Sequence, residues 1–111
     1  MRIAILLLSL SPVFAQMPAP KNLKLLKPEE VMPAMKSFTV ALGVKCDFCH
    51  VMTDFASDEK HHKEMARHMI ELARGINALF PDGKQHVTCY TCHRGAEEPA
   101  TAPPAEAPAA N

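Results

Sequence analysis

The sequence predicts a small all-α protein built from two similar helical units. Apolar residues recur at spacings of three and four over residues 28–42 and again over about 58–80. Spacing of this kind places apolar side chains on one face of a helix. Each stretch is followed by a turn and then by the same pattern, Val-x-Cys-x-x-Cys-His. With 111 residues, the chain has room for about one domain, so we expect one helical domain that contains a pseudo-repeat.

Residues 1–15 have the pattern of a signal peptide. Arg2 precedes an apolar run over residues 3–10, and Ala15 ends a short segment typical of a cleavage site. A short apolar strand or buried helix is the alternative interpretation. Because the run is far shorter than the roughly 20 residues that span a bilayer, we expect export to the periplasm or another extracytoplasmic space, with no membrane-spanning segment after cleavage.

The rest of the chain divides into a lead-in, a domain and a tail. Two prolines predict an irregular lead-in over residues 16–27, and the domain is expected over residues 28–96. Residues 97–111 are almost entirely Ala, Pro, Glu and Thr. Such a segment has no large apolar side chain to bury, so we expect a disordered tail.

The boundaries of the two helices follow from local signals. In the first helix Pro33 fits only near the start, so the regular part can begin as late as Met32, and Gly43 is the expected stop. In the second helix Ser57 and Asp58 can cap the start. We therefore expect the second helix to run from about residue 58 to residue 80.

All four cysteines of the chain belong to the pattern C-x-x-C-H. Two Cys three residues apart place both sulfurs on one side of a turn, where they can form thioethers along one porphyrin edge, and the following His can bind the iron. A folded segment this small also buries little apolar surface by itself. The sequence thus predicts two covalently bound haem c groups that form the core, with Cys46, Cys49 and His50 holding one and Cys89, Cys92 and His93 holding the other.

Two other uses of paired cysteines fit the sequence less well. A Cys₄ zinc site is disfavoured because 39 residues separate Cys49 from Cys89, more than the roughly 15–20 of a zinc ribbon. A thioredoxin-like redox site expects a βαβ context, which the helical pattern lacks.

The sixth ligands of the two irons are harder to assign. Met35 and Met69 each lie on the apolar stripe of the helix that precedes a cysteine motif, although a methionine in such a stripe can equally be core filler. His62 and His68 on the second helix, and His86 just before the second motif, are the alternatives.

The segments Met35–His50, Ala66–Met69 and Val87–Gly95 resemble the photosynthetic reaction-centre cytochrome c subunit family. The resemblance implies that a Met within each helix is the sixth ligand of the haem bound by its own unit. Met35 would then serve the haem on Cys46 and Cys49, and Met69 the haem on Cys89 and Cys92.

Two classes of function remain at this point, an electron carrier and a haem enzyme such as a peroxidase or small-molecule reductase. Available methionines on both helices favour the carrier, whose irons have no open position, and no pattern for a distal acid–base pair is evident. Twelve basic and twelve acidic residues give no net field that would attract nucleic acid. We therefore expect redox proteins as partners.

Overall fold

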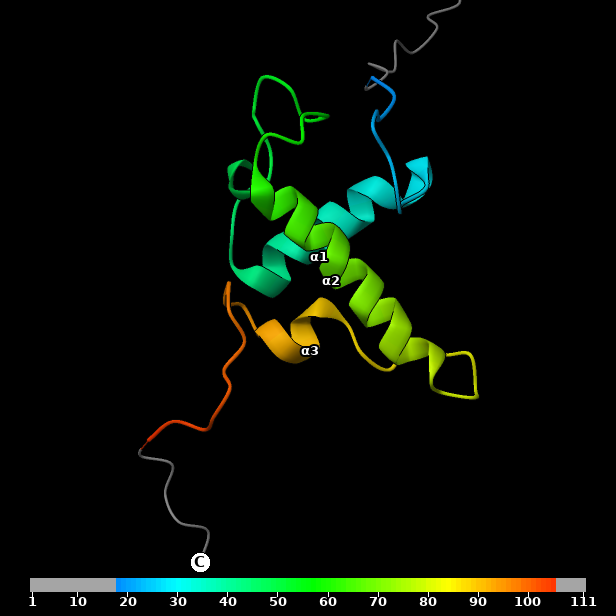
Figure 1. The fold of residues 1–111 in the computed structure, drawn as a ribbon, viewed down its shortest axis with the longest axis vertical. Helices are drawn as coiled ribbons and strands as arrows, with labels where there is room; N and C mark the ends of the chain where they lie inside the picture. Colours follow the sequence, from blue (N-terminus) through cyan, green and yellow to red (C-terminus); the bar gives the residue numbers. More distant parts are fainter. Residues whose placement is uncertain (1–17, 106–111) are drawn as a thin grey trace, which may run out of the picture.

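The computed structural model describes residues 18–105, so the predicted signal peptide and the last six residues of the predicted tail lie outside it. Helices are the only regular elements in these residues, apart from one isolated bridge between Val51 and Asp54 (Figure 1). The elements are η1 (Pro28–Glu30), α1 (Val31–Leu42), η2 (Cys46–Phe48), α2 (His61–Ala78) and α3 (Cys89–His93). The prediction of an all-α chain is confirmed.

Helix α1 begins and ends through local backbone chemistry. The backbone N–H of Lys27 donates to the Glu30 carboxylate at 2.8 Å, which closes η1 just before α1. Pro33 lies in the first turn of α1, where its missing N–H would have no partner in the helix. The predicted stop is confirmed, because Gly43 ends α1 in the left-handed conformation with φ 66° and donates its N–H to the Thr39 carbonyl.

Helix α2 begins at His61, later than the predicted start near Asp58, and its N-cap Lys60 makes no capping bond through its side chain. The predicted capping role of Asp58 is wrong because three cations hold its carboxylate. Asp58 pairs with Arg67 at 3.0 Å, Lys63 at 3.3 Å and Lys24 at 3.6 Å. The Asp58 carboxylate is therefore held beside these three cations and does not cap the helix.

The segment before η1 has no helix or strand over residues 18–27, yet it is attached to α2. Arg74 donates to the carbonyl of Leu25 at 2.9 Å, and Arg67 donates to the carbonyl of Asn22 at 3.4 Å. The Asn22 amide in turn donates to the carbonyl of Ala56 at 2.8 Å. These bonds hold the lead-in, the loop before α2 and α2 together.

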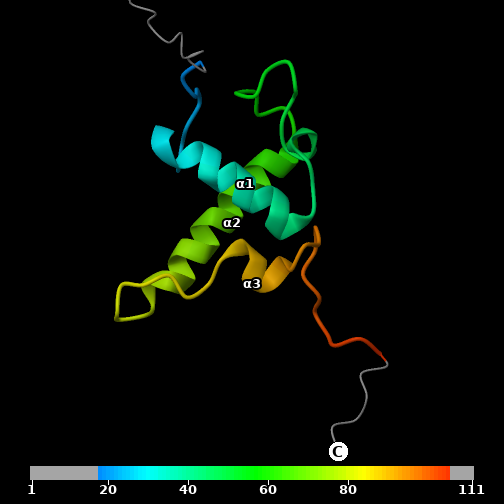
Figure 2. The ribbon, with the colours of Figure 1, turned by 180° about the vertical axis from the view of Figure 1, so that it is seen from behind.

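Helices α1 and α2 form two crossed layers: α2 lies in front of α1 in Figure 1 and behind it in Figure 2. Helix α1 packs mainly against α3 and η1, and the N–H of Gly95 donates to the carbonyl of Ala41 at 2.8 Å. Ala41, 1% exposed, is the buried apolar residue of the described chain, where no large side chain is fully buried. The helices therefore leave most of their apolar faces free of protein contacts.

Within residues 18–105, no helix is long and apolar enough to cross a membrane.

Candidate haem sites

The first C-x-x-C-H motif follows α1 and folds into a tight turn. Residues Cys46–Phe48 form η2, and the carbonyl of Cys46 accepts the N–H groups of both Cys49 and His50, at 3.3 and 3.0 Å. His50 follows the second cysteine directly in the sequence, and its backbone N–H belongs to this turn. All four cysteines of the chain are free thiols, as thioether formation requires.

The second motif is helical rather than a 3₁₀ turn, so the two units differ in local structure. Residues Cys89–His93 form α3, and the N–H of the N-cap Thr88 donates to the Thr91 hydroxyl at 2.9 Å. Asn77 on α2 fixes the approach to this helix through three hydrogen bonds. Its Oδ1 accepts from the N–H groups of His86 and Val87 at 2.8 and 2.9 Å, and its Nδ2 donates to the Val87 carbonyl at 2.8 Å.

The histidines of the two motifs share one hydrogen-bond arrangement. His50 Nδ1 bonds to the carbonyl oxygen of Phe55 at 2.9 Å, and His93 Nδ1 bonds to that of Ala96 at 3.0 Å. A carbonyl can only accept, so each Nδ1 carries the proton and each Nε2 presents a lone pair. A metal-binding His usually donates its other ring N–H to a backbone carbonyl or a carboxylate. This bond fixes the orientation of the ring and its tautomer.

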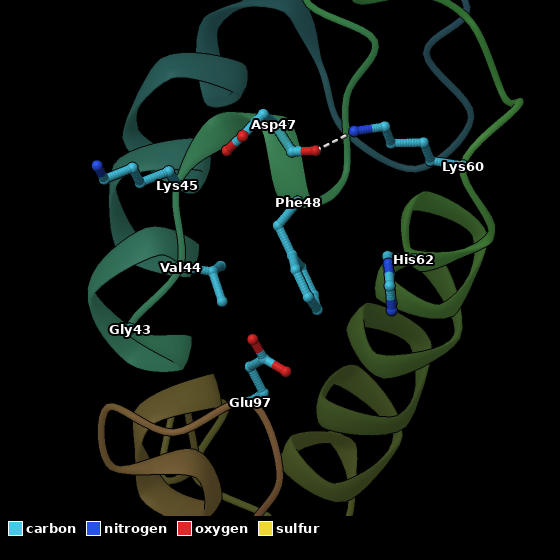
Figure 3. A pocket seen from close by; sticks show the side chains of 8 residues that line it. All are labelled: Gly43, Val44, Lys45, Asp47, Phe48, Lys60, His62 and Glu97. Atoms are coloured by element: carbon cyan, nitrogen blue, oxygen red, sulfur yellow. Dashed lines mark hydrogen bonds between the residues drawn. The ribbon is translucent and has the colours of Figure 1, made fainter.

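Two hollows border the first motif. One of ≈ 540 Å³ lies between η2, α2 and the segment after α3, and Figure 3 shows Phe48, Val44 and Glu97 pointing into it. A second of ≈ 550 Å³ lies beside Thr39, Cys46 and Met52. Both hollows are shallow and open to solvent.

Cations and burial shape the chemistry of the first motif. The Lys60 ammonium donates to the carbonyl of Asp47 (Figure 3). Burial raises the pKa of the Cys49 thiol, while the positive charge of Lys60 opposes that rise. Burial likewise raises the pKa of Cys89. One thiol of each pair is thus partly buried, and its pKa lies above the ordinary value of a thiol.

The two candidate methionine ligands lie where the sequence placed them, on the helix before each motif. Met35 is half-buried on α1, and Met69 on α2 is 39% exposed. Neighbouring apolar residues on α2, Met65 and Leu72, are also exposed. These side chains have no protein partner to bury them, and the ligand roles of Met35 and Met69 stay predictions.

The alternative histidines have surroundings of their own. His86 bonds through Nε2 to both carboxylate oxygens of Asp82, at 2.8 and 2.9 Å, and stacks on Phe80 with ring centroids 4.0 Å apart. His68 is exposed and faces Glu71. His62 stacks on Phe48 at 4.0 Å, beside the first motif rather than the second. Of these three histidines, His86 thus has its Nε2 engaged by a carboxylate.

Sequence reasoning missed Asn77, Lys60 and Lys63 as residues that organise the motifs. For Asn77 a signal existed, because Asn is an unfavourable residue within a helix, and it is favoured where its side chain can bond to nearby backbone groups. The lysines had no such signal, since lysines at the start of an exposed helix are ordinary. Among residues 18–105, no three His, Cys, Asp or Glu side chains come close enough to hold a metal ion by themselves.

The described residues fit covalently bound haem. They combine free thiol pairs at the right spacing, histidines with a free Nε2, hollows at a motif, and apolar helix faces that the protein leaves uncovered. A helical chain with these features is a c-type cytochrome.

Comparison with known proteins places it more narrowly. Residues 12–108 match the family described as the photosynthetic reaction centre cytochrome C subunit, and the chain belongs to this family. Its members are c-type cytochromes, which are electron carriers rather than enzymes and hold haem c covalently.

Individual relatives match shorter stretches. Cytochrome c-554 of Chloroflexus aurantiacus is 46% identical over 61 residues, 50% of this chain and 15% of the relative. The photosynthetic reaction center cytochrome c subunit of Thermochromatium tepidum is 47% identical over 55 residues, 45% of this chain and 13% of the relative. That of Roseobacter denitrificans is 36% identical over 78 residues, 62% of this chain and 20% of the relative. The matched part of this chain thus spans a fifth or less of these relatives' length.

Proposed function

We propose that this chain is an exported diheme c-type cytochrome that carries single electrons between redox proteins in the periplasm or another extracytoplasmic space. The observation that carries the proposal is the matched support of the two histidines. Each C-x-x-C-H motif ends in a His whose Nδ1 donates to a backbone carbonyl a few residues later. Two motifs with the same support are what two haem sites need.

Each haem would be held by one motif and one helix. Cys46 and Cys49 would form the thioethers of the first haem, with His50 and Met35 as its axial ligands. The second haem would be bound in the same way by Cys89, Cys92, His93 and Met69. Haem c, when bound, supplies one-electron chemistry at iron.

The two axial ligands decide between carrier and catalyst. With a His and a Met both bound, each iron would have no open position for a substrate. A thioether ligand would also favour a higher potential than a second imidazole does. Helices α1 and α2 offer Met35 and Met69 on faces without a protein core. Apolar helix faces laid against the macrocycles would also exclude water from them.

The remaining segments complete the proposed organisation. A signal peptide over residues 1–15 would direct export, and cleavage after Ala15 would leave Gln16 as the first residue. The lead-in over residues 16–27 would precede a diheme domain over residues 28–96, and residues 97–111 would form the tail. The partners would be a redox protein donor and a redox protein acceptor.

Intact mass of the exported protein tests the number of haems. The chain is produced in cells that attach haem c, and we expect the mass of the peptide that begins at Gln16 plus two haems. Replacing both cysteines of one motif by Ser should remove one haem, whichever motif is changed. A wild-type mass with one haem, no haem or bound zinc would contradict the proposal.

Spectroscopy of the same protein tests the carrier assignment. Both irons should be low-spin, with the weak near-infrared band of sulfur-to-iron charge transfer in the oxidised form. Bis-histidine signals would transfer the ligand role to His62, His68 or His86. A high-spin iron that binds cyanide rapidly would contradict the carrier assignment and favour a haem enzyme instead.

A further inference from the structure

Lys63 shares a hydrogen-bond acceptor with the His of the first motif. The carbonyl oxygen of Phe55 accepts from His50 Nδ1 at 2.9 Å and from the Lys63 ammonium at 2.9 Å. A carbonyl oxygen has two lone pairs, so both bonds can form at once. Lys63 therefore touches the atom that supports the proposed iron ligand.

The Lys63 ammonium is held in place and shielded from water. It also donates to the carbonyl of Ser57 at 2.8 Å and pairs with Asp58 at 3.3 Å. Its side chain is only 13% exposed. A charge fixed in this way is screened less by solvent than an exposed lysine.

The negative charge beside Lys63 does not cancel the local positive charge. Asp58 is one carboxylate among three cations, Lys63, Arg67 and Lys24, and Glu64 pairs with Arg67 on its other side. Three positive charges against two negative ones leave this cluster with an excess of one positive charge.

The second motif has no such neighbour within residues 18–105. The carbonyl of Ala96 accepts from His93 Nδ1 at 3.0 Å, and no side-chain cation bonds to it. At the first motif, by contrast, Lys63 bonds to the carbonyl of Phe55 and Lys60 to that of Asp47. The two histidines have the same support, but only the support of His50 is shared with a cation.

Two effects of Lys63 act in the same direction. A cation on the acceptor draws electron density from the carbonyl oxygen of Phe55. The hydrogen bond from His50 Nδ1 to this oxygen therefore weakens, and the imidazole becomes a poorer donor to iron. The positive charge itself favours the iron state of lower charge. Both effects favour the reduced state and raise the reduction potential.

We propose that Lys63 is a positioning residue that sets the haem on Cys46 and Cys49 at a higher reduction potential than the haem on Cys89 and Cys92. The inference rests on the proposed pair of haems. It also sets the order of reduction: in an equilibrium titration, the haem on Cys46 and Cys49 is reduced before the haem on Cys89 and Cys92.

The test is a redox titration of the exported holoprotein, followed by its visible spectrum, in wild type and Lys63→Met. Wild type should show two one-electron midpoints. Lys63→Met keeps the aliphatic stem and removes the charge, so it should lower only the higher midpoint. We expect a change on the order of tenfold in the equilibrium ratio of reduced to oxidised haem, which is ~59 mV for one electron.

Two further variants separate this effect from loss of structure. Lys63→Arg keeps the charge and should restore most of the higher midpoint. Lys24→Met removes a cation from the same Asp58 carboxylate but touches no carbonyl of the motif, so it should leave both midpoints nearly unchanged. Equal shifts in Lys63→Met and Lys24→Met, or a shift of the lower midpoint, would overturn the proposal.

Proton NMR of the reduced protein gives a second readout. The Nδ1 proton of His50 should move downfield in Lys63→Met, because its bond to the Phe55 carbonyl strengthens, while that of His93 should not move. If the protein binds two haems but Lys63→Met changes neither the midpoints nor the chemical shift of the His50 Nδ1 proton, this inference alone is refuted. A mass with one haem would refute the proposed function instead.

Discussion

Replacing Gly43 by Ala tests the junction between the two C-x-x-C-H motifs. Gly43 ends α1 with φ 66° just before the first motif, and it lies against Gly95, just after the second. The N–H of Gly95 donates to the carbonyl of Ala41. A side chain at position 43 therefore presses on the contact that holds the two motifs together.

The structure gives the magnitude in two parts. The left-handed conformation costs a residue with a Cβ roughly 1–2 kcal/mol. The new Cβ would overlap the carbonyl oxygen of Gly95 and lie 3.1 Å from its carbonyl carbon, and forcing backbone apart in this way costs about 1–3 kcal/mol. The free energy of unfolding should fall by about 2–5 kcal/mol, a large part of the ~5–15 kcal/mol of a typical domain.

Two other glycines supply matched controls. Gly83 has φ +67° with nothing within 4 Å of a Cβ, so Gly83→Ala should show only the conformational cost. Gly75 lies within α2, also with open space around a Cβ, so Gly75→Ala should stabilise by about 0.5–1 kcal/mol. Urea unfolding of the holoproteins, followed by circular dichroism, measures all three. If Gly43→Ala costs no more than Gly83→Ala, the close approach of Gly95 is refuted.

Three further predictions concern the second motif, the lead-in and the ligands. Asn77→Ala should cost about 2–3 kcal/mol and reduce haem attachment at the second motif, because three backbone groups before that motif lose their partner; urea unfolding and intact mass measure the two effects. The Asn22 amide, the Arg67 guanidinium and the Lys63 ammonium hold the pKa of the Asp58 carboxyl well below its usual range. The unfolded chain thus takes up this proton first, and stability should fall as the pH drops below about 4, as urea midpoints at successive pH values will show. Met35→His should lower one haem midpoint in a redox titration, and Met69→His the other.

Each of these three has its own control. Asn77→Asp keeps the Oδ1 acceptor and should retain more of the second haem than Asn77→Ala. Asp58→Asn should remove this part of the acid dependence, and an unchanged pH profile in that variant would show that the ion cluster does not act as described. A single methionine variant that moves both midpoints equally would contradict separate ligand roles.

Much of the fold was predictable because its signals are local. The apolar spacing of the two long helices, the stop at Gly43 and the cysteine spacing each depend on a few neighbouring residues. The start of α2 was not predictable in this way. Asp58 looks like a cap by its position, but cations on the lead-in and on α2 draw its carboxylate away.

The sequence by itself determined the chemistry of this protein, because thioether attachment and the first axial ligand need only five consecutive residues. It also indicated that the helices bury little apolar surface against each other, because so small a chain has few large apolar side chains. What the tertiary structure decided is how the two motifs differ. The bonds from Lys63 to the Phe55 carbonyl and from Asn77 to the Val87 carbonyl join a helix to a loop. Such side-chain-to-backbone bonds leave no periodic pattern in a sequence.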